Sequence, residues 1–100
     1  MTANGKTKFC LGQIVATPGA IEAMQESGQT PDFFLDRHAQ GDWGEVCPED
    51  WQLNQASLVD GSRILSVFRT LKGTRLYVIT EAEGDDGHRA ATTILLPEDY

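Results

Sequence analysis

The strongest constraint on the fold is a series of three β-type segments between Gly61 and Pro97. The segments are rich in Val, Ile, Leu, Thr, Tyr and Phe, which suit a pleated, half-buried surface. They are RILSVFRTL (Arg63–Leu71), TRLYVITE (Thr74–Glu81) and AATTILL (Ala90–Leu96). Lys72-Gly73 separates the first two, and EGDDG separates the last two. Loops this short join antiparallel neighbours, because a parallel crossover needs about a dozen residues or more. The sequence therefore predicts an antiparallel β-meander.

The first hairpin has an expected register in which Thr70 faces Arg75 and Phe68 faces Tyr77. Aromatic and β-branched pairs of this kind stabilise neighbouring strands. A G1 bulge at Gly73 would instead shift the pairing by one residue and exchange the faces of one strand. Both faces carry apolar residues at mid-strand, which favours helices on one face and a partial cover on the other, with a homodimer as one such cover.

Three helix signals precede these strands. Thr17-Pro18, Thr30-Pro31 and Pro48 mark the starts, and Gly28, Gly41 and Gly61 mark the ends. Before them, FCLGQIVA (Phe9–Ala16) is typical of a short extended segment. We therefore predict an α+β domain, with three short N-terminal helices packed on an antiparallel three- to four-stranded β-meander. Residues 1–8 are expected to form a disordered N-terminus and residues 9–100 the single domain.

The net charge of the chain indicates which classes of partner it can bind. The net charge is −7, with 15 Asp and Glu against 8 Lys and Arg, which disfavours nucleic acid and anionic membranes. Four acids cluster at the end of the second strand segment and in the loop that follows it; they are Glu81, Glu83, Asp85 and Asp86. Such a cluster is either solvated surface or a negative surface for a basic partner.

The cellular setting predicted from the sequence is the cytoplasm. No apolar run approaches the ~20 residues that span a bilayer, and no secretion signal opens the chain. Cys10 and Cys47 lie far apart and outside any CxxC pattern. We expect two reduced, buried or partly buried thiols rather than a disulfide. Scattered Cys and His residues favour neither a metal site nor a cofactor.

Several blocks resemble a family of small uncharacterised proteins from bacterial plasmids, phages and integrating elements, often labelled plasmid-related. The blocks are LGQIVATPGAIEAM, RHAQGDWGEV, DGSRILSVF, VITEA and TTILLPEDY. In that family an Asp and an Arg follow Thr-Glu-Ala directly, whereas here Glu83 replaces the acid and Gly84–His88 stands as an insertion before Arg89. The resemblance implies a mobile-element setting and no established activity.

His38, Asp42 and Trp43 form the most site-like group. A carboxylate four residues after a helix-terminal histidine could orient its imidazole for acid–base chemistry. The alternative is a helix cap, in which Gly41 takes the left-handed position, Asp42 makes a local turn and Trp43 anchors the loop. Both tryptophans, Trp43 and Trp51, are expected to be buried.

The polar residues of the strands give a second candidate group. Arg63 and Glu81 are expected to pair across neighbouring strands. The alternative is that they join His38 and Thr92 in a metal-independent, barnase-like ribonuclease or toxin site, where such groups bind phosphate and transfer protons. Two hypotheses follow. One is a small acidic accessory protein that binds another protein through the Asp42–Trp43 loop or the four clustered acids, and the other is this nuclease. The charge favours the first.

Overall fold

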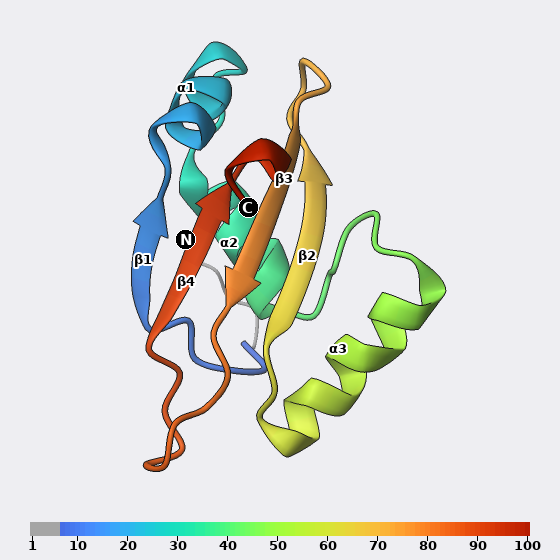
Figure 1. Cartoon of the computed structure of the whole chain (residues 1–100). Helices are drawn as coiled ribbons and strands as arrows, with labels where there is room; N and C mark the ends of the chain where they lie inside the picture. Colours follow the sequence, from blue (N-terminus) through green and yellow to red (C-terminus); the bar gives the residue numbers. More distant parts are fainter. Residues whose placement is uncertain (1–6) are drawn as a thin grey trace.

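The computed structural model describes residues 7–100, which form three helices and a four-stranded sheet (Figure 1). In chain order the elements are β1 (Gln13–Ala16), α1 (Pro18–Glu26), α2 (Pro31–Ala39), α3 (Pro48–Asp60), β2 (Ile64–Arg69), β3 (Arg75–Thr80), β4 (Ala91–Leu95) and the 3-10 turn η1 (Pro97–Asp99). The α+β class is therefore confirmed. The disorder expected for residues 1–8 falls mostly on residues outside the described range.

The sheet is mixed, with strand order β1-β4-β3-β2. The meander of β2, β3 and β4 is antiparallel as predicted. However, β1 pairs with β4 in parallel, with Gln13 opposite Ala91 and Ala16 opposite Ile94. The prediction of an entirely antiparallel sheet was wrong at this strand. No short loop joins β1 to β4, so loop length placed no constraint on their relative direction.

The β2–β3 hairpin contains the bulge at Gly73. Arg69 lies opposite Arg75, so the expected register was wrong by one residue. Thr70 N donates to Thr74 O (2.8 Å), Gly73 N donates to Thr70 O (2.8 Å), and Gly73 has φ +89°. Glycine tolerates this left-handed backbone, and the bulge moves every β3 side chain to the other face.

Helices α1 and α2 cover one face of the sheet, behind it in Figure 1. Both begin as the sequence predicted: Pro18 and Pro31 open the first turns, and Thr17 Oγ1 accepts a hydrogen bond from Ala20 N (3.3 Å). The core lies between these helices and the sheet and consists of Ala20, Ala23, Met24, Phe34, Leu35, Phe68, Leu76, Val78 and Ile94. No helix in residues 7–100 is long and apolar enough to cross a membrane.

Helix α3 stands beside β2 at the edge of the sheet (Figure 1). The Asn54 amide donates to Leu65 O (2.7 Å) and accepts from Leu65 N (3.1 Å), and Ser57 Oγ donates to Arg63 O (3.1 Å). This helix therefore contacts the strand through small polar side chains that replace a neighbouring strand. Trp51 is left 50 % exposed, so the prediction that it is buried was wrong.

Within residues 7–100, the opposite face of the sheet is covered by no α-helix (Figure 1). Tyr77 packs there against Tyr100, with ring centroids 6.0 Å apart, and the Arg63 guanidinium lies 5.8 Å from the Tyr100 ring centroid. The 3-10 turn η1 folds against β3 and brings Tyr100 to this position. The face is thus partly covered by the chain's own last residues.

Candidate functional site

His38 lies at the centre of a buried chain of hydrogen bonds. It projects from α2 into the space under the sheet and is fully buried. Its Nδ1 shares a hydrogen bond with Ser66 Oγ (2.5 Å), and its Nε2 shares one with Thr80 Oγ1 (2.8 Å). The Thr80 and Thr92 hydroxyls are 2.6 Å apart, and Thr92 Oγ1 donates to Leu11 O (2.7 Å). Four side chains from α2, β2, β3 and β4 are thereby connected.

The chain of hydrogen bonds fixes the histidine tautomer. A hydroxyl has one proton to donate, and Thr92 donates its proton to the Leu11 carbonyl. Thr80 must therefore donate to Thr92 and accept from His38, so the proton of the neutral ring sits on Nε2. Ser66 then donates to Nδ1. Every donor in this series of hydrogen bonds has an acceptor, and a buried polar network is stable only when its donors are satisfied in this way.

The pKa of His38 is lowered to about 3, first by burial and second by the positive charge of Arg89. The ring is therefore neutral near pH 7. Ser66 and His38 have the contact of a nucleophile and its base, but both are fully buried. A general base must reach the proton that it removes, so this arrangement acts within the core and does not face a substrate.

The loop after α2 is a helix cap, as one of the two interpretations predicted. Gly41 has φ +89°, and Asp42 N donates to Arg37 O (2.9 Å). Asp42 accepts hydrogen bonds from Arg37 Nε (2.7 Å) and Gly44 N (3.1 Å). Burial raises the pKa of the Asp42 carboxyl, but these hydrogen bonds outweigh it and lower the pKa overall. The carboxylate is engaged locally, and the His38 ring is oriented by Ser66 and Thr80 instead.

Trp43 is a buried anchor rather than a surface contact. It is 2 % exposed, and its ring is edge-on to His38 with centroids 5.8 Å apart. Its Nε1 donates to Gln55 Oε1 (3.0 Å) on α3. The indole therefore joins the capping loop, the buried histidine and α3. Of the proposed binding pair in this loop, only Asp42 reaches solvent.

The residues of the nuclease hypothesis lie in two different environments. His38 and Thr92 belong to the buried chain of hydrogen bonds, whereas Arg63 and Glu81 are exposed. No ion pair joins Arg63 to Glu81 within residues 7–100. The cross-strand pair expected from the sequence is thus absent from the described part of the chain.

Arg89 was assigned no role from the sequence, yet it is a buried arginine, 5 % exposed. Its Nη1 donates to Ser62 O (2.7 Å) and Glu81 O (3.0 Å), and its Nη2 donates to Ser57 O (3.1 Å). Ser57 lies in the last turns of α3, where the helix dipole favours a cation. The guanidinium therefore ties the end of α3 to the end of β3. The only signal in the sequence was the arginine in the family resemblance.

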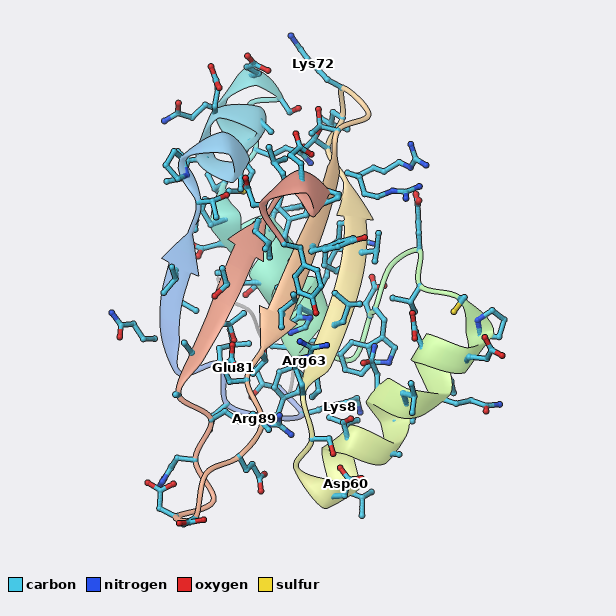
Figure 2. The ribbon with its side chains drawn as sticks, in the orientation of Figure 1. Lys8, Asp60, Arg63, Lys72, Glu81 and Arg89 are labelled. Atoms are coloured by element: carbon cyan, nitrogen blue, oxygen red, sulfur yellow. The ribbon has the colours of Figure 1, made fainter. Side chains whose placement is uncertain are left out.

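The four clustered acids are exposed on the loop between β3 and β4. Glu83 forms an isolated antiparallel bridge with Arg89, and the residues between them fold into a tight turn, where Gly87 N donates to Gly84 O (2.9 Å). The side chains of Asp86 and His88 lie 3.4 Å apart at the surface. Figure 2 shows Glu81 and Arg89 at the end of the sheet away from the Lys72 hairpin.

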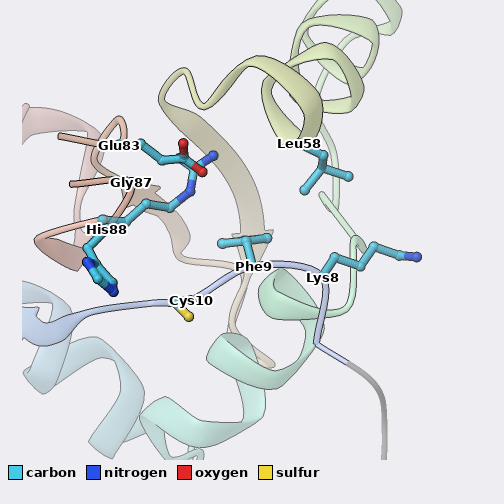
Figure 3. A pocket seen from close by; sticks show the side chains of 8 residues that line it. Lys8, Phe9, Cys10, Leu58, Glu83, Gly87 and His88 are labelled. Carbon is cyan, nitrogen blue, oxygen red and sulfur yellow. The ribbon is translucent and has the colours of Figure 1, made fainter. Parts of the chain in front are cut away.

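A pocket of about 210 Å³ lies where the N-terminal segment, the acidic loop and α3 meet (Figure 3). Its lining has mixed charge and consists of Lys8, Phe9, Cys10, Leu58, Glu83, Gly87, His88 and Arg89.

Cys10 and Cys47 have free thiols, but both are exposed, so their expected burial was wrong. Within the described residues, no group of three or more His, Cys, Asp or Glu side chains could hold a metal ion.

Comparison with known protein families, with curated proteins and with solved structures found no match to this chain. The resemblance to plasmid- and phage-encoded proteins therefore stays a prediction. What the protein does has to be inferred from the arrangement of its own residues.

Proposed function

We propose that this protein is a small acidic accessory protein of a mobile genetic element that acts by binding another protein. The observation that carries the proposal is the exposed loop with Glu81, Glu83, Asp85 and Asp86. Among the ion pairs of residues 7–100, only the contact between Asp86 and His88 engages any of these carboxylates. The charge of the loop is therefore free to act on a partner.

A basic surface is the natural complement of this loop. Surface charges of one sign steer an oppositely charged partner and raise the association rate more than they strengthen the final complex. The effect decreases with salt, because exposed charges are screened beyond ~8 Å at physiological ionic strength. The rest of the surface adds to the field, since the whole chain has a net charge of −7.

The geometry of His38 supports a binding role over the ribonuclease alternative. The candidate general base is fully buried, and both of its nitrogens are engaged by hydroxyl groups. Arg63, the candidate phosphate ligand, lies over the Tyr100 ring on the helix-free face of the sheet. A site built from both residues would require the core to open.

Reversing the four loop acids to lysine is expected to slow association with the partner by about tenfold or more at low salt and by less at high salt. The partner would first be identified by cross-linking and mass spectrometry, and the rates then measured by surface plasmon resonance. The matched control reverses four exposed acids of α1 and α2, namely Glu22, Glu26, Asp32 and Asp36. Equal rates for the two variants would contradict a role specific to the loop.

A ribonuclease assay provides the opposing test. We expect no cleavage when the purified protein is incubated with mixed single-stranded and structured RNA, with or without a chelator. Cleavage that survives the chelator and is lost in a folded Arg63→Ala variant would overturn the proposal. Arg63 is exposed, so this substitution should leave the fold intact.

A further inference from the structure

We propose that the free edge of β1 is the place where the partner docks, as an extended segment with an apolar centre and basic ends that adds a fifth strand to the sheet. This inference rests on the proposed function and specifies how the partner is held. Strand addition of this kind obtains affinity from main-chain hydrogen bonds and specificity from alternate side chains.

The outer edge of β1 presents backbone groups that no backbone hydrogen bond within residues 7–100 engages. Gln13 N donates to Ala90 O (3.0 Å) and Thr17 N donates to Ile94 O (3.0 Å), so the odd-numbered residues of β1 face β4. In a parallel ladder, the backbone N–H and C=O groups of alternate residues point away from the neighbouring strand. The N–H and C=O groups of Ile14 and Ala16 therefore point away from the sheet, where β1 is the last strand.

At the opposite edge of the same sheet, α3 and the loop after α2 make hydrogen bonds to the outer side of β2. Along β2, the Asn54 amide pairs with both backbone groups of Leu65. Val67 N donates to Trp43 O (3.0 Å) and its carbonyl accepts from Glu45 N (2.7 Å). Proteins commonly cover an edge strand to prevent unwanted pairing. Here the β2 edge is covered at Leu65 and Val67, whereas no other strand in residues 7–100 pairs with the outer edge of β1.

The sequence of β1 also lacks the usual protection of an edge. The strand is Gln-Ile-Val-Ala, with no charged residue and no proline. Ile14 is 43 % exposed and Val15 is 42 % exposed, and they point to opposite faces of the sheet. An added strand would therefore meet an apolar side chain on each face. Four residues suit a short recognition segment better than a whole second sheet.

Acids at both ends of β1 favour a basic occupant. At the start of the strand, Gln13 N donates to Ala90 O (3.0 Å), and the acidic loop begins beside the same segment, where Glu81 N donates to Ala91 O (3.0 Å) (Figure 1). At the end of the strand, Thr17 Oγ1 donates to Asp99 Oδ2 (2.8 Å). A second copy of the chain would bring the same acids together on an edge-to-edge dimer. A segment with lysine or arginine at its ends complements them.

The test uses a synthetic peptide of alternating valine and threonine with lysines at both ends, and the same peptide with glutamates at the ends. We expect the lysine peptide to bind, and hydrogen exchange to slow at the Ile14 and Ala16 amides of the wild-type protein. Ile14→Pro removes an outward N–H and leaves the ladder with β4 intact; it should weaken binding about tenfold. The control Ile14→Val retains the N–H and should change binding by less than about twofold.

Three results would overturn the inference. The first is that the lysine peptide does not change hydrogen exchange at the Ile14 and Ala16 amides. The second is that the lysine and glutamate peptides bind equally well. The third is that the wild-type protein sediments as a dimer while Ile14→Pro sediments as a monomer. The exchange experiment needs no variant, so it decides even if the proline variant fails to fold. If the variant with four reversed loop acids binds the lysine peptide normally while the amides stay protected, the acidic-loop proposal fails and the docking edge stands.

Discussion

Replacing Trp43 with alanine is expected to lower the free energy of unfolding by about 3–5 kcal/mol, enough to unfold most of a domain this small. The indole is 2 % exposed. It packs against the His38 ring and Phe9 and donates a hydrogen bond to Gln55 on α3. Its removal would leave a cavity beside the buried histidine and detach α3 from the capping loop.

Trp51 provides the matched control within the same chain. It has the same side chain but is 50 % exposed, so Trp51→Ala should cost less than about 1 kcal/mol. Urea denaturation of both variants, followed by circular dichroism, measures the difference. Similar losses for the two tryptophans would mean that Trp43 does not carry the packing assigned to it.

The elements of the fold could be predicted where local chemistry decides them. Prolines at 18, 31 and 48 open the helices, and the short loops make the meander antiparallel. The hairpin register could not be settled, because it depends on whether Gly73 forms a bulge. The direction of β1 depends on its pairing with β4, at the other end of the chain, and no local signal encodes that pairing.

The candidate site was predicted less well because burial is a property of the whole fold. His38 and Thr92 were identified as chemically notable, and they do share one hydrogen-bonded chain, but Thr80 and Ser66 complete it. The helix-cap interpretation of Gly41–Asp42 was correct because it uses neighbouring residues only. The role of Arg89 depends on carbonyls from three separate segments, which no spacing in the sequence reveals.

His38 is also expected to make the protein sensitive to acid well above the pH at which carboxylates are protonated. Its pKa is about 3 in the folded protein and 6.5 for an unperturbed histidine, and burial is the main cause. Between these values the unfolded chain binds one more proton than the folded chain. Stability therefore falls as the pH drops below 6.5, by up to about 1.4 kcal/mol per pH unit, and this loss is absent at pH 7 and above.

Urea denaturation at a series of pH values between 7 and about 4 isolates this effect. The lowered pKa of Asp42 has its consequences below the usual aspartate value of 3.8, outside that window. His38→Gln should be less stable than the wild type at pH 7 but should lose the slope, because a neutral amide binds no proton. The control His88→Gln replaces an exposed histidine, 78 % accessible at its side chain, and should keep the slope. A wild-type stability that is flat from pH 7 to about pH 4 would show that His38 is protonated without cost, and hence that it is not held neutral in the core.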